Sequence, residues 1–387
     1  MDSSHKTTFV KDQLDFLEKS GLYRRLRTVV ARGPTANVDG KEVINLCSND
    51  YLGLSQNKRV IENTISALSE EVSQCGSRLI AGNHPKIIEL EGLLAYHRRT
   101  ESALLYPTGY TANLGVVTTI ADKNSTIFSD ELNHASIVDA CRLSGATIIV
   151  FRHNDTDHLQ ELMRRSRGRK IVITEGIFSM DGDMGKLSEI KSIADHHDAI
   201  TIIDDAHGDF IFGPTFSGMP AKMGVNFDIH VSSMSKALGC FGGYVATTFP
   251  IRELLINTSR QFIYTSALPD HLCSAASTAI PIAKSGYLQK RLQWSILYFS
   301  EAIKRLGFKV ANSTSQIIPV IVGKEVQALE LSKELLEEGV FAQAIRYPTV
   351  KKGFARLRIS LNAMHRQEHL DSAVAALERA GKKTGIL

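Results

Sequence analysis

Short and almost wholly apolar runs, separated by helical patterns, fill the chain from about residue 45 to residue 250. The runs are rich in β-branched residues, and in chain order they are ESALLYP, STIFSD, ATIIVF, KIVITEG, AITIIDD, DIHVSSM and GGYVATT. Such strands are typical of a parallel or mixed sheet that helices cover on both faces, because neither face then needs polar side chains. The pattern therefore predicts an α/β fold with a mostly parallel central sheet.

The two ends of the chain have different patterns. The first 30 residues have the charged amphipathic pattern of a helix. After about residue 285 a long helix precedes SQIIPVIVG, a helix from about Val326 to Glu338 that Gly339 ends, the runs GVFAQAI and ARLRISL, and a last helix. At 387 residues the chain exceeds the roughly 250–300 residues of one core. We predict an N-terminal helical segment (1–45), a large α/β domain (46–285) and a small C-terminal α+β domain (286–387).

Composition and charge narrow the class of protein. Charged residues make up 22% of the chain and the net charge is +4, so nothing requires a nucleic-acid or membrane partner. The most basic run, RRSRGRK, fits a solvated helix end and turn better than a polyanion site. The N-terminus has no apolar stretch of signal-peptide length, and no run reaches the roughly 18 apolar residues of a membrane span. We therefore expect a cytoplasmic enzyme.

Cysteine and histidine positions predict neither a disulfide framework nor a metal site. The five cysteines are scattered, and no CxxC pair occurs. The neighbours His196 and His197 lack the spacing of helical metal ligands and fit a surface position at a helix end. We expect reduced cysteines that pack in the fold, and no metal.

Polar residues follow three of the apolar runs, where strands of the sheet would end. They are Glu175 and Ser179 after KIVIT, then Asp204, Asp205 and His207 after AITII, then Ser232, Ser233, Ser235 and Lys236 after DIHV. Any one of these sites could be a strand that leaves the sheet through a capped turn. Three together favour a charged ligand, because ligands of such sheets bind at the carboxyl ends of the strands and buried charges need partners.

Pyridoxal phosphate is a ligand that uses a lysine, a carboxylate and a seat for a phosphate. Its aldehyde binds a lysine covalently, its ring nitrogen stays protonated beside a carboxylate, and its phosphate prefers a helix N-terminus. Lys236, among small residues in VSSMSKALGC, and Asp204 offer the first two. In YPTGYTANLGVV, Gly109 and Tyr110 follow Thr108 and open a helix, so their backbone N–H groups would face the phosphate.

The chain resembles the fold-type I, pyridoxal-phosphate-dependent α-oxoamine synthases over nearly its whole length. The matching motifs, in family order, are LYRRLRTV, INLCSNDYLGLS, GSRLIAGNHP, TGYTANLG, LNHASIVDACRLSGA, TEGIFSMDGD, IDDAHG, SSMSKALGCFGGY, FIYTSALP, AIRYPTV and ARLRISLNAMH. The resemblance implies a fold-type I transferase, a pyridoxal phosphate cofactor, amino acid and acyl thioester substrates, and a homodimer with the site at its interface.

The resemblance also implies roles for individual residues. Lys236 matches the lysine that binds the cofactor, and Asp204 matches the partner of the pyridine nitrogen. His207 matches the residue that hydrogen-bonds the ring hydroxyl, and His134 matches the histidine that stacks on the ring. These four are the implied catalytic residues. Further cofactor contacts are implied for Gly109, Tyr110, Ser179 and Ser233, and from the second subunit for Thr265 and Ser266.

Four other residues match positions of the substrate pocket. Arg358, the second arginine of RLR, matches the arginine that binds the amino acid carboxylate, which suits the fork of a guanidinium. Arg24, Asn49 and Glu175 match further substrate positions. The implied reaction is a decarboxylative Claisen condensation of an amino acid with an acyl thioester.

Within the family, GSRLIAGNHP and RYPTVKKGFARLRISLNAMH are most similar to the oxononanoate synthase branch, which joins L-alanine to a pimeloyl thioester, with CoA or a carrier protein, in biotin synthesis. Glycine C-acetyltransferase and other α-oxoamine synthases are the alternatives. Two residues depart from the family pattern: Ile87 replaces a common histidine, and Ser217 a common arginine. Two alternatives from another class are a non-catalytic partner subunit and a regulator with this fold. The first would usually lose Lys236, which is present, and the second would need a helix-turn-helix, which the first 45 residues lack.

Overall fold

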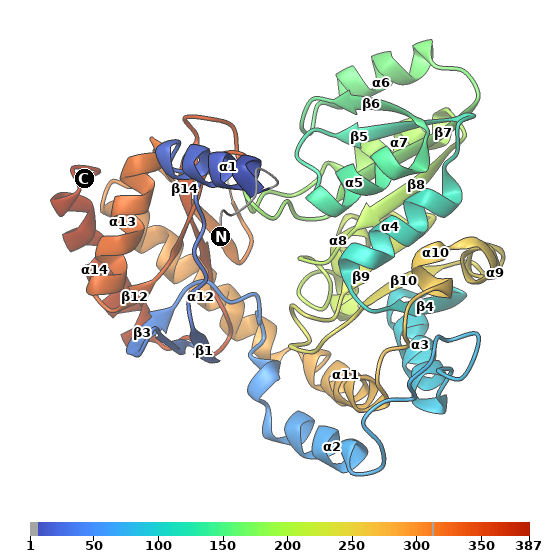
Figure 1. Cartoon of the computed structure of the whole chain (residues 1–387), viewed down its shortest axis with the longest axis horizontal. Coiled ribbons are helices and arrows are strands. Elements are labelled where there is room, and N and C mark those ends of the chain that lie inside the picture. The colour runs from blue at the N-terminus through green and yellow to red at the C-terminus, as the bar shows by residue number, and fades with distance from the viewer. Residues whose placement is uncertain (1–6, 312) are drawn as a thin grey trace.

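A seven-stranded sheet forms the centre of the computed structural model, which describes residues 7–311 and 313–387 (Figure 1). Its strand order is β4-β10-β9-β8-β7-β5-β6. The strands are β4 (Ser102–Tyr106), β5 (Ser125–Asp130), β6 (Thr147–Phe151), β7 (Arg169–Glu175), β8 (Ala199–Asp204), β9 (Ile229–Ser233) and β10 (Gly243–Thr247). β10 runs antiparallel to both of its neighbours, and the other pairings are parallel. All seven predicted strands are confirmed, as is the mostly parallel sheet.

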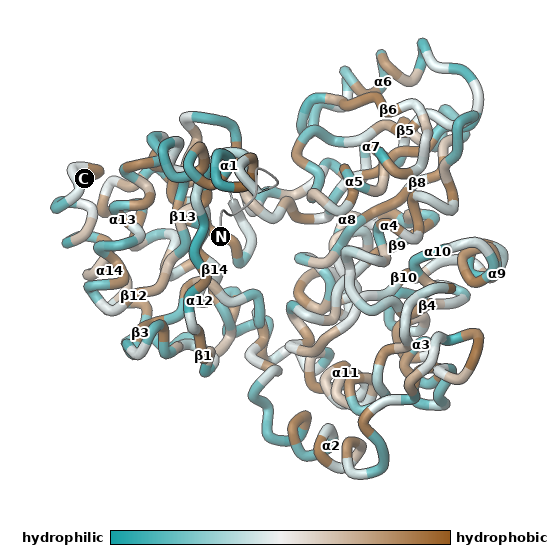
Figure 2. The backbone as a smooth tube through the Cα atoms, viewed as in Figure 1, coloured by the Kyte–Doolittle hydropathy of each residue, from teal (hydrophilic) through white to brown (hydrophobic). Residues whose placement is uncertain are grey.

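Helices cover both faces of this sheet (Figure 1), which explains why most of its strands are mainly apolar (Figure 2); the edge strand β6 is largely exposed. Neighbouring residues of one strand belong to different cores: Ile171 and Ile173 pack under α4, α5, α9 and α10, whereas Val172 packs under α6 and α7. The helices of the first core are α4 (Gly109–Ile120), α5 (Ala135–Ser144), α9 (Phe249–Thr258) and α10 (Arg260–Ile263). Those of the opposite face are α3 (Pro85–Arg98), α6 (Thr156–Arg165), α7 (Leu187–His196), α8 (Gly218–Met223) and α11 (Asp270–Ala283).

A second group of elements follows the sheet. It contains the three-stranded sheet β11-β14-β13 and three helices. The elements are α12 (Tyr287–Arg305), β11 (Ile317–Gly323), α13 (Glu325–Glu337), β12 (Val340–Phe341), β13 (Gln343–Ile345), β14 (Ala355–Ser360) and α14 (Gln367–Lys383). The predicted strands and helices after residue 285 are therefore present. The domain boundaries at 45 and 285 stay predictions.

The N-terminal part differs from the expected single helix. α1 spans Thr8–Lys19. Residues 1–6, which the predicted helical segment includes, lie outside the described residues. Three strands follow: β1 (Val29–Arg32), β2 (Thr35–Val38) and β3 (Lys41–Asn45). Turns at Gly33 and Gly40, both with positive φ, reverse the chain between them. β3 pairs in parallel with β12, so these strands lie beside the C-terminal elements in Figure 1.

Three short elements remain. The 3-10 helix Leu54–Gln56 and the helix α2 (Lys58–Leu68) lie between β3 and α3, and the 3-10 helix Pro214–Phe216 lies between β8 and α8. Among the described residues, the helices are too short or too polar to cross a membrane.

Candidate active site

The carboxyl ends of β7, β8 and β9 meet at a cavity of about 190 Å³. The strand register places Glu175 beside Asp204, and Asp204 beside Val231. Lys236 follows β9 in a turn and reaches the same cavity. Members of all three predicted polar sites come together here: Glu175, Asp204, His207, Ser233, Ser235 and Lys236. Asp205 and Ser232 do not, because Asp205 pairs with Arg98 and Ser232 donates to Asp209 away from this cavity.

Lys236 is paired with a neutral histidine. Its Nζ lies 3.1 Å from His207 Nε2. Burial lowers the pKa of the Lys236 ammonium; the carboxylate of Asp204 opposes this effect and the charge of Arg358 adds to it. Burial and then the charge of Lys236 hold the pKa of His207 well below its ordinary value, so this ring is uncharged at neutral pH. Lys236 is thus a more available base than a solvated lysine.

Asp204 is held in place by its neighbours. Its Oδ2 accepts a hydrogen bond from Asn113 Nδ2 at 2.7 Å, and its Oδ1 accepts one from the Ala206 amide at 3.0 Å. Asn113 is buried on α4 and also donates to Ser136 Oγ at 3.0 Å, while its Oδ1 has no partner among the described residues. Sequence reasoning missed Asn113, although its position four residues after Gly109 places it on the same helix face.

The first turn of α4 forms the other side of the cavity. Thr108 caps the helix, since its Oγ1 accepts from the Thr111 amide at 3.0 Å. The amides of Gly109 and Tyr110 have no acceptor within the helix, because the first turn of a helix leaves its N–H groups free. The Ser233 hydroxyl faces this turn from β9.

Two glycines let the first turn of α4 and strand β10 lie close together, and Gly243 on β10 has the tighter contact. A Cβ on Gly109 would lie 3.2 Å from Ser233 Cβ, and a Cβ on Gly243 would lie 2.4 Å from the Gly109 nitrogen. The free N–H groups of Gly109 and Tyr110 and the Ser233 hydroxyl therefore surround a small space, which fits a phosphate. With Lys236 and Asp204 on the opposite side, the residues fit pyridoxal phosphate.

His134 and Glu175 complete the cavity. His134 caps α5, and its Nδ1 lies 2.8 Å from Ser136 Oγ. Burial lowers the pKa of His134. Glu175 is buried and accepts a hydrogen bond from the His134 amide. Burial, and then the negative charge of Asp204, raise the pKa of Glu175 well above its ordinary value, so we describe it as a neutral carboxyl group.

A second cavity of about 360 Å³ joins the first, because His134, His207 and Lys236 line both. Arg358 projects into it from β14. Its Nη1 donates to Asn49 Oδ1 at 3.1 Å, and its Nε donates to the Ser179 carbonyl at 2.6 Å. The rest of the wall is mainly apolar and consists of Cys47, Met180, Phe341 and Ile345, with Gln343. A small carboxylate bound by Arg358 would therefore lie close to Lys236.

Three predicted site residues line neither of the two joined cavities. Arg24 lines a larger cleft of about 1020 Å³, which shares Phe341, Gln343 and Ile345 with the second cavity. Thr265 and Ser266 line a small separate space, and the backbone of Ser266 forms an isolated antiparallel β-bridge with Ser77. Their contact with a cofactor of the second subunit stays a prediction.

The two departures from the family pattern are buried. Ile87 is part of the apolar core, and the Ser217 carbonyl accepts a hydrogen bond from Arg98 at 2.9 Å. Among the described residues that line the two joined cavities, neither is present.

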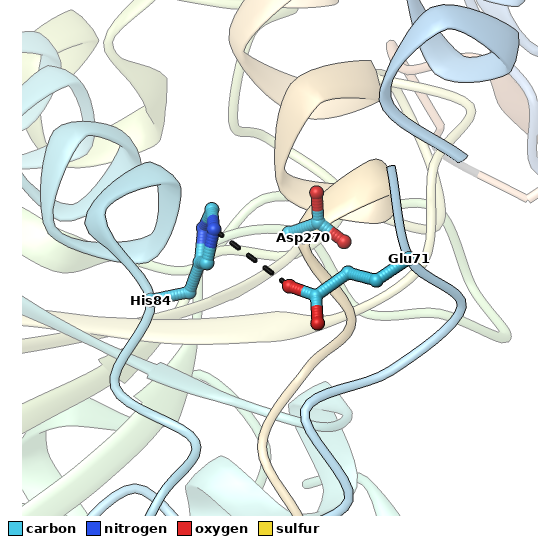
Figure 3. Close-up of side chains that lie close together, drawn as sticks. All are labelled: Glu71, His84 and Asp270. Atoms are coloured by element: carbon cyan, nitrogen blue, oxygen red, sulfur yellow. Dashed lines mark ion pairs between the residues drawn. The ribbon is translucent and has the colours of Figure 1, made fainter. Parts of the chain in front are cut away.

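One cluster of possible metal ligands lies in another part of the described chain: Glu71, His84 and Asp270 (Figure 3). The Lys86 ammonium lies 3.2 Å from Asp270 Oδ2 and supplies a positive charge already. His84 Nδ1 accepts from the Lys86 amide at 3.2 Å, so the neutral ring carries its proton on Nε2, the nitrogen that faces Glu71. This nitrogen then has no lone pair for a cation. We interpret the cluster as an ion-pair network.

Comparisons with known proteins give the family context. Residues 41–377 match the family aminotransferase class I and II. The chain is 42% identical to 8-amino-7-oxononanoate synthase of Thermoanaerobacter pseudethanolicus, and the similarity covers 100% of both chains.

Two solved structures are similar over most of the chain. Serine palmitoyltransferase from S. paucimobilis, solved with bound PLP, has a TM-score of 0.93 and 28% identity over 100% of both chains. The 8-amino-7-oxononanoate synthase of Francisella tularensis has a TM-score of 0.76 and 27% identity, covering 88% of this chain and 98% of that one.

Proposed function

The chain belongs to the aminotransferase class I and II family and, within it, to the pyridoxal-phosphate-dependent α-oxoamine synthases; from this premise we propose that it condenses L-alanine with a pimeloyl thioester. The products are 8-amino-7-oxononanoate, CO₂ and the free thiol, as a step of biotin synthesis. The observation that carries the proposal is the placement of Lys236, Asp204 and Arg358 around two joined cavities.

The chain provides a distinct group for each requirement of the reaction. Bound pyridoxal phosphate supplies an electron sink for the negative charge that develops at Cα of the amino acid. Asp204 would accept the hydrogen bond of the ring nitrogen, and Asn113 holds that carboxylate in position. The first turn of α4 and Ser233 would bind the phosphate.

Arg358 and Lys236 act on the amino acid. The guanidinium of Arg358 binds the substrate carboxylate, and its hydrogen bonds to Asn49 and Ser179 fix it in the second cavity. Lys236 lies between the two cavities and takes the Cα proton, because its lowered pKa makes the neutral amine more available near pH 7.

The bonds then change in a defined order. Cα of alanine forms a bond with the thioester carbonyl carbon, the C–S bond breaks, and the thiolate leaves with the electron pair. The bond between Cα and the carboxyl carbon breaks next and CO₂ leaves. Cα receives a proton, and Lys236 is the group placed to return it.

The acyl chain would lie in the cleft of Arg24. This cleft opens from the second cavity at Phe341, Gln343 and Ile345, and its walls carry the arginines Arg24, Arg25, Arg27 and Arg346. An apolar entrance followed by positive charge suits a pimeloyl chain that ends in a carboxylate, or the phosphates of a CoA or carrier-protein thioester.

The test is turnover of the purified, cofactor-loaded protein with L-alanine or glycine, each paired with pimeloyl-CoA or acetyl-CoA, with products identified by mass spectrometry. Formation of 8-amino-7-oxononanoate from L-alanine and pimeloyl-CoA supports the proposal. Preference for glycine with acetyl-CoA would instead assign glycine C-acetyltransferase activity.

The same proposal includes a homodimer in the cytoplasm. Thr265 and Ser266 line a space separate from the cofactor cavity of their own chain. Two residues close to them expose large apolar side chains. Tyr264, which precedes Thr265, is 72% exposed. Ile80, three residues after the Ser77 that bridges with Ser266, is 85% exposed. Light scattering should give the mass of a dimer, whereas an active monomer would contradict this part of the proposal.

A further inference from the structure

A row of hydrogen bonds connects Lys236 to Arg358 through three side chains. Lys236 Nζ lies 3.1 Å from His207 Nε2, and His207 Nδ1 lies 2.7 Å from Tyr51 Oη. Tyr51 Oη lies 3.0 Å from Asn49 Oδ1, which also accepts from Arg358 Nη1 at 3.1 Å. Tyr51 is fully buried in the turn after β3 and lacks an assigned role in the proposed reaction.

The chemistry of Arg358 sets the direction of the whole row. A guanidinium can only donate, so the Asn49 atom that it faces is an oxygen. Tyr51 Oη, at 3.0 Å from the same oxygen, must therefore point its hydrogen at Asn49. Only lone pairs of Tyr51 are then left for His207.

The same logic fixes the histidine. Because the Tyr51 oxygen accepts, His207 Nδ1 carries the ring hydrogen. A neutral imidazole has one such hydrogen, so Nε2 is bare and accepts a hydrogen bond from Lys236. Burial keeps the pKa of His207 well below its ordinary value, which rules out a doubly protonated ring near pH 7.

We propose that Tyr51 is a positioning residue, which fixes the tautomer of His207 and thereby gives the Lys236 amine a hydrogen-bond acceptor. Without the Tyr51 hydroxyl, His207 Nδ1–H would lose the acceptor that it has in the structure. The ring would then place its hydrogen on Nε2 and point it at Lys236. The ammonium form of Lys236 would lose a hydrogen bond, and its pKa would fall.

Other charged groups also act on this pair. Asp204 raises the pKa of Lys236 and Arg358 lowers it, while Glu175, which lines the same cavity, is a neutral carboxyl group. Lys236, Arg358 and His134 all lower the pKa of His207. A Tyr51→Phe substitution keeps the aromatic ring and leaves all of these charges in place, so the change isolates the hydroxyl.

The test uses the full-length protein, from which pyridoxal phosphate has been removed and to which it is then restored. The rate at which the visible absorbance of the covalently bound cofactor develops is measured against pH, because only the neutral amine of Lys236 reacts. The midpoint of this profile reports the pKa of Lys236 without any turnover. We expect the midpoint of Tyr51→Phe to lie about one pH unit below that of the wild type.

A second variant and a control make the test specific. Asn49→Ala removes the acceptor of the Tyr51 hydroxyl, which is then free to donate to His207 Nδ1 and impose the same tautomer change. Its midpoint should shift in the same direction. Tyr106→Phe removes another buried hydroxyl, which donates to Ser259 at 3.1 Å, and should leave the midpoint unchanged.

Wild-type midpoints in both Tyr51→Phe and Asn49→Ala would overturn the role of Tyr51. If Tyr51→Phe does not fold, an unshifted midpoint in Asn49→Ala alone overturns it. The inference rests on Lys236 as the cofactor-binding residue of the proposed function. A wild-type protein that develops no visible absorbance at any pH would overturn both, whereas unshifted variants of a reactive wild type overturn only the inference.

Discussion

Asn113 gives the sharpest test of how the protein holds its cofactor. The residue is 1% exposed, and its Nδ2 donates to Asp204 Oδ2 at 2.7 Å. Asn113→Ala removes this donor and opens space next to the cavity, where water can reach the carboxylate. Asp204 would then be less firmly placed to receive the ring nitrogen of pyridoxal phosphate.

The expected magnitude follows from the charge of the acceptor. A hydrogen bond to a charged group contributes about 1.5–3 kcal/mol, which is more than a neutral pair contributes. At about 1.4 kcal/mol for each tenfold change, the variant should bind pyridoxal phosphate roughly 10- to 100-fold more weakly. Asn113→Asp should be worse, because a second carboxylate beside Asp204 favours its protonation.

The assay is titration of cofactor-free protein with pyridoxal phosphate, followed by visible absorbance. Thr119→Ala is a matched control on the same helix, since Thr119 Oγ1 has no hydrogen-bond partner among the described residues. The control should bind as the wild type does. Equal affinities for the wild type and Asn113→Ala, in folded proteins, would refute the idea that Asn113 positions Asp204.

Further substitutions test the remaining groups. Lys236→Ala should abolish the absorbance of the covalently bound cofactor while circular dichroism stays unchanged; an unaltered spectrum would remove Lys236 from its role. Arg358→Lys should raise KM for the amino acid roughly 10- to 100-fold, because one ammonium replaces a two-pronged donor, and an unchanged KM would place the carboxylate elsewhere. Glu175 has a raised pKa in the folded chain, so folding takes up protons and stability falls as pH rises above the ordinary value of about 4.3. Melting temperatures of cofactor-free Glu175→Gln should therefore exceed those of the wild type by more at pH 8 than at pH 5, and a constant difference would contradict a neutral Glu175. Gly243→Ala should weaken cofactor binding, because its Cβ would lie 2.4 Å from the Gly109 nitrogen and displace the first turn of α4; unchanged affinity would show that this turn can adjust.

Local pattern was sufficient to predict the central sheet. Most of its strands are apolar on both faces because helices cover both, so each is visible in the sequence without knowledge of its neighbours. The strands of residues 29–45 were missed for the opposite reason. β3 pairs with β12 from the far end of the chain, β1 is exposed along its whole length, and β2 has only four residues, so the local pattern is weak.

The residues of the candidate site also fall into those that local sequence predicts and those that it does not. Lys236, Asp204 and Glu175 follow apolar strands, so their position at one sheet edge could be predicted. Asn113 and Tyr51 act through hydrogen bonds to residues 91 and 156 positions away in the sequence, and an asparagine or a tyrosine carries no local sign of such a partner. Those contacts became visible only in three dimensions.

The pairing of β3 with β12 also constrains how the chain is made. On the ribosome, β3 emerges early, and its parallel partner follows only after about 300 further residues. At a synthesis rate of roughly 5–20 residues per second, the edge of β3 therefore stays unpaired for about 15–60 s. An unpaired edge invites association with other nascent chains, and charges such as Lys41 and Glu42 on β3 discourage it. Replacing these two charges with apolar residues would therefore be expected to reduce the yield of newly made protein more than the stability of the finished fold.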